Sequence, residues 1–453
     1  MSTAPSLTAS TLRCAGCGAS PAPDAAFPFQ CPNLGRDGAD HVLVRTLDRG
    51  ARFGPVDDRE PNPFVRYRTR LHSYHRARSG GIPDDTFVEM VRRLDARVAE
   101  ADGRGFRVTP FARRSRLSTA LGFEPGGGIW VKDETGNVSG SHKARHLMGI
   151  LLHLEVSEML GLADPHDRPV LAVASCGNAA LAAAVLAAAA GRRLQVFVPV
   201  DADPAVLARL RALDSEVCVC ERRAGQTGDP CYVRLREALA EGALPFTCQG
   251  DLNGLAIEGG ETLAYEMANA MQATGTHMDH LIVQVGGGAL ASSCTQALEE
   301  ALSLGEIRVR PRMHTVQTEG VHPLERAYRR FVADMGRRER SEELEAFLQR
   351  AARHRSRYMW PWEAAASSVA TGILDDEAYD WLAVVGGMLR SGGLSVVVGE
   401  SALRRAHELG GRCGFEADPT GTSGLAGLSE LLSRGVVGPG QRVALLFTGV
   451  ERS

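Results

Sequence analysis

From about residue 128 onward, short β-like runs alternate with helical stretches along the chain. The expected strands cover residues 128–134, 170–175, 194–199, 216–220, 245–248, 281–285, 313–319, 394–399 and 443–449. Helical stretches long enough for a crossover lie between most of them, at 178–190, 203–213, 230–241, 255–273 and 401–410. Such alternation predicts βαβ units and parallel sheets covered on both faces. The sequence therefore predicts an α/β fold.

In sheets of this kind, ligands bind at the carboxyl ends of the strands, in the turns that open helices. One such turn is SCGNAA (175–180), which follows an expected strand. Gly177 allows the backbone to turn tightly, and Asn178 opens a helix. The small residues leave backbone N–H groups free to hold an anion such as a carboxylate.

A second turn, VGGGALAS (285–292), places three consecutive glycines before a helix. Glycines in this position let the backbone approach a phosphate closely. The turn lacks the GK[ST] of a Walker A loop, and it lacks the GxGxxG spacing of a dinucleotide fingerprint. A plain tight strand-to-helix turn explains the glycines alone equally well.

A third turn, ADPTGTSGLAG (417–427), places Thr420 and Ser423 at a helix start. Capping of the helix by Asp418, Thr420 or Thr422 is expected whatever else this turn does.

Lysine is nearly absent from the chain. Of 51 basic residues only Lys132 and Lys143 are lysines. Lys143 falls in SGSHKARH (139–146), in the first turn of an expected helix, where the helix dipole disfavours an ammonium and lowers its pKa. A primary amine with a lowered pKa can form a Schiff base, which a guanidinium cannot. A surface lysine without a role is the alternative, and the scarcity of lysine elsewhere favours a functional one.

Residues 1–50 differ from the rest, because they are rich in turns and carry Cys14, Cys17 and Cys31. The CxxCG knuckle is a metal-binding geometry, and Cys31 could supply a third thiolate to a structural zinc ion. His41 is a possible fourth ligand. The alternative is a degenerate ribbon held by packing alone.

The overall charge excludes some partners. A net charge of −3 and a pI near 6.5 argue against a nucleic-acid or anionic-membrane binder. The longest apolar run, 179–191, is too short to span a bilayer. Ten cysteines without a visible signal peptide are typical of cytosolic thiols, so a cytoplasmic location is expected.

Taken together and in order, these motifs make the chain resemble the fold-type II family of pyridoxal-phosphate enzymes. The likeness covers roughly residues 107–450. It depends on VTPF (108–111), KDETGNVSGSHKAR (132–145), SCGNAALAAA (175–184), IEGGETLAYE (257–266), VGGGAL (285–290) and DPTGTSGLAG (418–427). The resemblance implies a tryptophan synthase β-like fold of two open parallel-sheet βαβ domains, here after a short N-terminal zinc-ribbon-like segment.

The resemblance also implies roles for individual residues. Lys143 would bind pyridoxal phosphate as a Schiff base and move the α-proton of the substrate. Asn178 would hydrogen-bond the ring hydroxyl of the cofactor, and Thr420 would face its ring nitrogen. The N–H groups of Gly286, Gly287, Gly288 and Ala289 would hold the phosphate. The substrate would be bound by Ser175, Cys176, Gly177, Ala179 and His142.

Within the family the motifs point in different directions. IEGGETLAYE and the N-terminal cysteines are most similar to threonine synthase. Ala144 and Glu261, however, replace an Asp and a Lys that are usual there, and a carboxylate at 261 is unfavourable if this position faces a phosphorylated substrate. SGSHKAR is closer to the dehydratases. His142 departs from all members, and either a proton donor or a packed side chain fits it.

The expected function is a lyase that removes the α-proton of a small amino acid and eliminates its β-substituent, possibly followed by β-replacement. The alternatives are threonine-synthase-type β,γ-replacement on O-phosphohomoserine and a pyridoxal-phosphate-binding protein without catalysis. A large domain of residues 51–136 and 255–453, a small domain of residues 137–254 and a homodimer are expected by analogy.

Overall fold

The computed structural model describes residues 10–48, 56–225, 229–336 and 344–452. Its larger sheet has six strands in the order β11-β10-β9-β12-β4-β3. These strands are β3 (Phe111–Arg113), β4 (Gly128–Asp133), β9 (His280–Gln284), β10 (Arg312–Thr318), β11 (Ser395–Val398) and β12 (Arg442–Phe447). All neighbours run parallel except β3, which is antiparallel to β4.

Helices cover both faces of this sheet, because each strand alternates its apolar side chains between two cores. On β12, Ala444 and Leu446 belong to one core, whereas Val443 and Leu445 belong to the other. The first core contains α9 (Ala256–Thr274), α10 (Ala289–Ser303), α11 (Pro323–Gly336), α12 (Leu344–Ala352) and α13 (Trp381–Ser391). The second contains α4 (Ser115–Ala120), α14 (Glu400–Arg412) and α15 (Ser423–Ser433).

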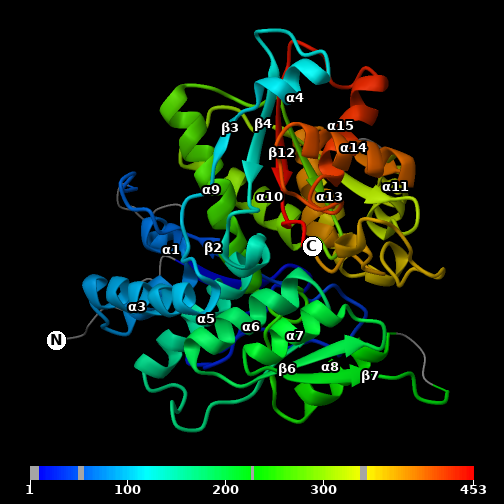
Figure 1. The fold of residues 1–453 in the computed structure, drawn as a ribbon. Coiled ribbons are helices and arrows are strands. Elements are labelled where there is room, and N and C mark those ends of the chain that lie inside the picture. Colours follow the sequence, from blue (N-terminus) through cyan, green and yellow to red (C-terminus); the bar gives the residue numbers. More distant parts are fainter. Residues whose placement is uncertain (1–9, 49–55, 226–228, 337–343, 453) are drawn as a thin grey trace.

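The smaller sheet has four parallel strands in the order β7-β6-β5-β8. They are β5 (Leu171–Ala174), β6 (Leu194–Pro199), β7 (Glu216–Cys220) and β8 (Leu244–Pro245). Its helices are α5 (Lys143–Met159), α6 (Asn178–Ala190), α7 (Pro204–Ala212) and α8 (Pro230–Ala240). In Figure 1 the two sheets and their helices form an upper and a lower part, and the C-terminus lies between them.

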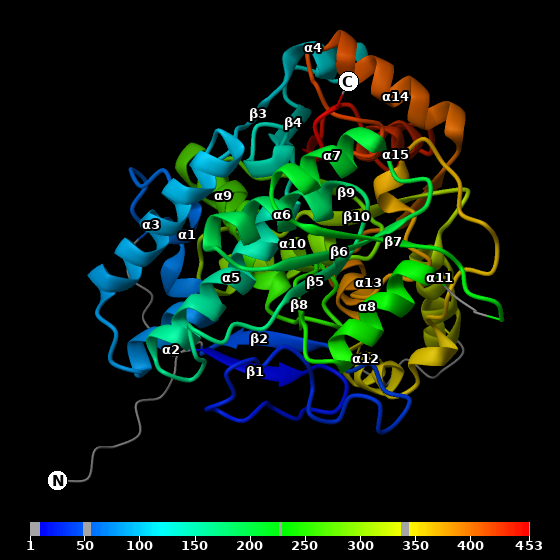
Figure 2. The same cartoon turned by 60° about the horizontal axis from the view of Figure 1, so that its bottom comes forward.

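The N-terminal elements pack beside both parts. β1 (Ser10–Cys14) and β2 (Leu43–Leu47) form an antiparallel pair that lies near α12 (Figure 2), where the N–H of Asp40 donates to the carbonyl of Ala352 over 2.7 Å. The remaining helices are α1 (Pro63–Arg66), α2 (His72–Ser79), α3 (Asp84–Asp102) and the short 3-10 turns η1 (Arg68–Arg70), η2 (Val138–Gly140), η3 (Arg355–Arg357) and η4 (Thr371–Ile373). Helices α2 and α3 pack against α5 and α6.

The predicted α/β fold with parallel sheets is confirmed. Every expected strand and helix is present with ends that differ by a few residues, although β8 keeps only two residues. The pairs β1–β2 and β3–β4 and the helices α1 to α3 were not expected. The strands of the smaller sheet all fall within residues 137–254. The domain boundaries themselves stay a prediction.

Two glycines explain how closely α5 and α9 approach. A Cβ built on Gly149 would lie 2.9 Å from the Cα of Gly259, and one on Gly259 would lie 2.0 Å from the carbonyl oxygen of Arg145. No larger side chain fits at either place. Gly259 of IEGGETLAYE therefore serves the packing of α9 on α5.

A buried network of charges ties α5 to the larger sheet. The guanidinium of Arg145 pairs with Glu134 at 2.8 Å and with Glu266 at 2.7 Å, and Lys132 pairs with Glu266 and donates to the carbonyl of Thr109 at 2.8 Å. Burial alone would raise the pKa of the Glu266 carboxyl, but Arg145 and Lys132 hold it below its ordinary value. Lys132 is thus a structural residue.

In the described part of the chain, no helix is both long and apolar enough to cross a bilayer.

Removal of the Arg145 guanidinium should destabilise the protein strongly, because it leaves the buried carboxylate of Glu134 without an ion pair and leaves Glu266 with Lys132 as its one remaining cation. We expect Arg145→Met to lower the free energy of unfolding by about 3–5 kcal/mol. The exposed pair Arg434–Glu430 supplies the control, and Arg434→Met should cost less than about 1 kcal/mol. Urea denaturation measures both, and equal effects would contradict the role assigned to the network.

Candidate active site

Lys143 begins α5 directly after a strained turn. Ser139 has a left-handed backbone with φ of 52°, which is uncommon for a residue other than glycine, and Gly140 follows with φ of 68°. The N–H of Ser139 donates to Asp102 over 2.9 Å, and the side chain of Asn137 donates to the carbonyl of Ser141 over 3.0 Å. Strain of this kind persists only where the surroundings enforce it, and it is common at functional sites.

The two lysines differ in what surrounds their amines. Lys132 is fully buried and paired, whereas Lys143 is half-buried, and within the described residues its Nζ makes no hydrogen bond or ion pair. The carboxyls of Asp375 and Asp380 lie within electrostatic reach of the Lys143 ammonium. The amine of Lys143 is therefore free to react.

The glycine loop connects β9 to α10 under a neighbouring acidic segment. Gly288 has φ of 103°, which favours glycine, and a Cβ on Gly286 would lie only 2.2 Å from Oδ2 of Asp375. Burial raises the pKa of the Asp375 carboxyl, while the Lys143 ammonium and the N–H of Gly287 oppose this shift. The carboxylate of Asp375 thus lies against the glycine loop. The N–H groups of this loop, at the start of α10, are suited to hold an oxyanion.

Thr420 is buried, and its Oγ1 accepts the N–H of Gly372 over 3.0 Å. The hydroxyl proton of Thr420 is therefore available to another acceptor. A hydroxyl can donate to an aromatic ring nitrogen, but it cannot keep that nitrogen protonated as a carboxylate would.

The turn of residues 175–179 opens α6. The N–H of Gly177 donates to Oγ of Ser175 over 3.4 Å, Cys176 is exposed, and Ala179 is partly buried against the core around α5 and α6. Asn178 starts the helix, and a Cβ on Gly449 would lie 3.0 Å from its Nδ2 and 3.0 Å from the carboxyl of Asp418.

The structure thus places four predicted segments near one another in two pairs. Asn178 lies beside the 418–420 turn through Gly449, and Asp375, which lies against the glycine loop, is within electrostatic reach of Lys143. These contacts support the predicted site without testing the role of any single residue.

His142 packs inside the protein. Its ring makes an edge contact with His146 at 5.5 Å, and burial, followed by the charge of Lys143, holds its pKa well below the ordinary value. His142 is therefore uncharged near neutral pH, which favours a packed side chain over a proton donor.

Glu261 does not support the charge argument drawn from the sequence. Its carboxylate is fully buried and pairs with Arg45 of β2, and the hydroxyl of Tyr265 donates to it over 3.2 Å. Its neighbours are thus an arginine and a tyrosine remote from Lys143 in the chain. Glu261 therefore gives no argument against a phosphorylated substrate.

The N-terminal cysteines form a compact cluster with His41. One ligand atom from each of Cys14, Cys17, Cys31 and His41 lies within 4.8 Å of all the others. The Sγ of Cys14 is 3.6 Å from Nδ1 of His41, and the Sγ atoms of Cys17 and Cys31 are 3.5 Å apart. Ligands around a tetrahedral zinc ion lie about 3.6–3.8 Å apart, as Zn–S and Zn–N bond lengths require.

A carboxylate orients the histidine of this cluster. Asp37 lies 2.8 Å from Nε2 of His41, which leaves Nδ1 for a metal, an arrangement usual among metal-bound histidines. Backbone N–H groups of Cys17 and Asn33 donate to the Sγ atoms of Cys14 and Cys31 over 3.4 Å each. The cluster is compatible with a structural zinc site closed by four protein ligands.

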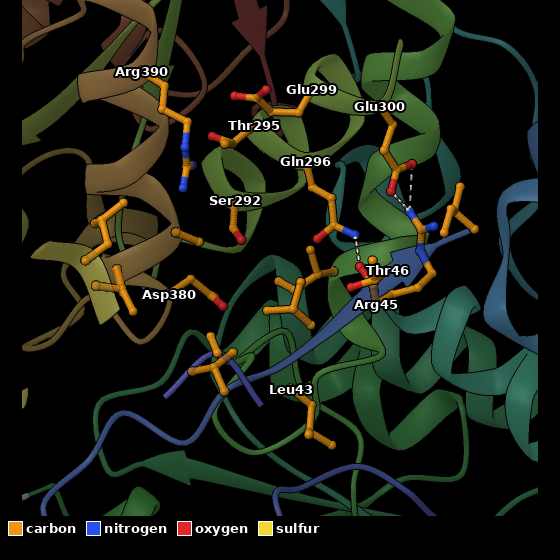
Figure 3. A pocket seen from close by; sticks show the side chains of 18 of the residues that line it. Leu43, Arg45, Thr46, Ser292, Thr295, Gln296, Glu299, Glu300, Asp380 and Arg390 are labelled. Carbon is orange, nitrogen blue, oxygen red and sulfur yellow. Dashed lines mark hydrogen bonds and ion pairs between the residues drawn. The ribbon is translucent and has the colours of Figure 1, made fainter. Parts of the chain in front are cut away.

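A cavity of about 550 Å³ lies elsewhere, between β2, α10 and α13 (Figure 3). Leu43, Arg45, Ser292, Gln296 and Asp380 are among its lining residues, but Lys143, Asn178 and Thr420 are not. None of the residues predicted to bind the cofactor or the substrate lines this cavity.

Sequence reasoning missed two residues near Lys143. Asp375 occurs in the segment SSVATGILDDEAYDW (367–381), which contains none of the glycine turns used in the sequence analysis. Arg452, which contacts Asn178, is the penultimate residue of the sequence and belongs to no motif.

An enzyme that carries an aldehyde cofactor needs a free primary amine to bind it and an oxyanion site for its phosphate. Lys143 and the glycine loop meet both needs, so fold and site define the class of pyridoxal-phosphate enzymes of fold type II. The family model described as "Pyridoxal-phosphate dependent enzyme" matches residues 104–449. The chain belongs to this family, and its cofactor is pyridoxal phosphate.

Several relatives show how the family varies. The chain is 24% identical to threonine synthase of Methanocaldococcus jannaschii over 342 residues, 75% of this chain and 74% of that protein. It is 27% identical to biosynthetic L-threonine dehydratase of Haemophilus influenzae, over 47% of this chain and 37% of that protein. Diaminopropionate ammonia lyase from Escherichia coli has a similar fold, with a TM-score of 0.57, 16% identity and coverage of 81% and 89% of the two chains.

Zinc content tests the N-terminal cluster. We expect one zinc ion per chain in protein purified without chelators, and its loss in Cys17→Ser and His41→Ala, since each removes a ligand. Cys413→Ser, which changes a cysteine outside the cluster, is the control and should keep the metal. Elemental analysis measures the zinc content. A zinc content of the wild type no higher than the background would contradict a zinc site at this cluster.

Proposed function

We propose that this chain is a lyase that acts on a small amino acid with a leaving group on its β-carbon. It removes the α-proton and eliminates the β-substituent as water, ammonia or another small group. The unsaturated amine that remains then takes up water and hydrolyses to a 2-oxo acid and ammonia.

Pyridoxal phosphate, when bound, withdraws electrons from the α-carbon of the substrate and makes its proton acidic. The N–H groups of Gly286 to Ala289, at the start of α10, would hold the phosphate. Lys143 would bind the aldehyde group, and its amine, once displaced by the amine of the substrate, would accept the α-proton at Nζ. Backbone N–H groups of the 175–179 turn would hold the substrate carboxylate.

Thr420 supports elimination over transamination. Its Oγ1 accepts the N–H of Gly372, so its proton is available and would donate a neutral hydrogen bond to the ring nitrogen. A cofactor ring whose nitrogen is unprotonated would accept less of the negative charge that remains when the α-proton of the substrate is removed. Departure of the β-substituent with its electron pair would remove that charge.

The observation that favours this reaction over phosphate chemistry is the acidic segment beside Lys143. Asp375, Asp376 and Glu377 are consecutive, and Asp375 lies against the glycine loop. Asp229, at the start of α8, is within electrostatic reach of Asp376 and Cys176. Asp375 lies at the loop assigned to the cofactor phosphate, so the carboxylates that bear on the substrate are those of Asp229 and Asp376. Carboxylates near the turn that would bind the substrate disfavour a phosphorylated substrate and favour a neutral or cationic side chain.

The second candidate is β,γ-replacement on O-phosphohomoserine. Similarity to threonine synthase over three quarters of the chain supports it, and so do the N-terminal cysteines. A binding protein without catalysis is the third candidate, and the unpaired amine of Lys143 argues against it. The predicted homodimer and cytoplasmic location stay predictions.

A substrate panel separates these candidates. The loaded protein should release ammonia and a 2-oxo acid from at least one of L-serine, D-serine, L-threonine and 2,3-diaminopropionate. Lys143→Arg should reduce this rate by roughly 10²–10⁴-fold or more, since it removes the base and the covalent link. Arg434→Gln, at the exposed C-cap of α15, should leave the rate unchanged.

Release of inorganic phosphate from O-phosphohomoserine, without 2-oxo acid from the other compounds, would contradict the proposal and favour the second candidate. No product from any compound would favour the third.

A further inference from the structure

The last described residues of the chain lie over the turn that carries Lys143. The N–H of Val450 donates to the carbonyl of Gly140 over 2.8 Å. A Cβ on Gly140 would lie 2.3 Å from Cγ1 of Val450, so only glycine fits beneath this residue. The turn and the C-terminal segment therefore hold each other in place, although more than 300 residues separate them in the sequence.

Arg452 extends this contact to two site segments at once. Its Nη2 donates to the carbonyl of Ser139 over 2.7 Å, and its Nη1 donates to Oδ1 of Asn178 over 2.5 Å. The N–H of Ser139 donates to Asp102 over 2.9 Å. The strained residue Ser139 is thus held on its N–H by a carboxylate and on its carbonyl by a guanidinium.

The guanidinium of Arg452 also determines the orientation of the Asn178 amide. Arginine carries donors only, so the atom it meets must be the amide oxygen. The oxygen of Asn178 is then occupied, and Nδ2 is the atom left for another partner. A hydrogen bond to a charged donor polarises the amide and strengthens Nδ2 as a donor.

We propose that Arg452 is a positioning residue for the cofactor. It fixes the spacing between the Lys143 turn and Asn178, and it directs Nδ2 of Asn178 at the ring oxygen of pyridoxal phosphate, which must then accept the hydrogen bond. This inference rests on the proposed roles of Lys143 and Asn178 and goes beyond them, because no motif includes residue 452.

The charges around Arg452 show how it acts. Asp102 and Asp418 face the guanidinium, while Glu451 faces His407 at 3.4 Å. Arg452 is exposed, so solvent screens its charge and its effect reaches the ring through the oriented amide.

The test compares Arg452→Met with wild type, each titrated with pyridoxal phosphate and followed by visible absorption. The dissociation constant of the cofactor should rise about tenfold, the equivalent of one charge-assisted hydrogen bond. The pH midpoint of the visible band should also move upward, because a ring oxygen that loses its donor holds a proton more tightly. Arg452→Lys should restore part of the affinity, and Arg434→Met is the matched surface control.

A double substitution separates positioning from general stability. In an Asn178→Ala background, Arg452→Met should shift the pH midpoint no further, because Arg452 acts through the amide. Additive shifts, or an Arg452→Met variant with the wild-type midpoint and affinity, would overturn the inference and leave the proposed function intact. A wild type that forms no visible band with pyridoxal phosphate would overturn the proposed function as well.

Discussion

The place of Lys143 depends on the guanidinium of Arg145, two residues further along α5. Arg145 pairs with Glu134 after β4 and with Glu266 on α9, and all three side chains are fully buried. An ion pair of this kind is costly to break, because the remaining charge stays away from water. The first turn of α5 is therefore fixed to the larger sheet, while the helix as a whole packs on α9 on one side and on α6 of the smaller sheet on the other. Helix α5 thus contacts both parts of the protein, and the amine of Lys143 lies in its first turn, where the two parts meet.

The order of strands and helices could be predicted because their apolar residues are local signals. The arrangement in space could not, since nothing in the run 443–449 shows that β12 lies between β9 and β4. The N-terminal strands were missed for a different reason. In LVRTL (43–47) an arginine occupies a buried position, and only the structure shows that Arg45 meets Glu258, Glu261 and Glu300. A sequence pattern assigns such a residue to the surface.

The site shows the same division. Residues that share a short motif, such as Lys143 or Gly286 to Gly288, could be predicted from the chain alone together with the family resemblance. Asp375 and Arg452 could not, because each acts through a contact between distant segments. His41 was only one possible ligand until the fold placed it beside three cysteines. Glu261 was misjudged because its partner, Arg45, belongs to a segment for which no structure was expected.

We propose that Lys143, and not Lys132, carries the cofactor. The most direct test is borohydride reduction of the protein loaded with pyridoxal phosphate, followed by proteolysis and mass spectrometry of the peptides. The chain has only two lysines, so a reduced Schiff base can form only at Lys143 or at Lys132. The account predicts a pyridoxyl group on the peptide that contains Lys143 and an unmodified Lys132, whose amine is buried against Glu266. A modified Lys132, or no modified lysine in protein that has bound the cofactor, would contradict it.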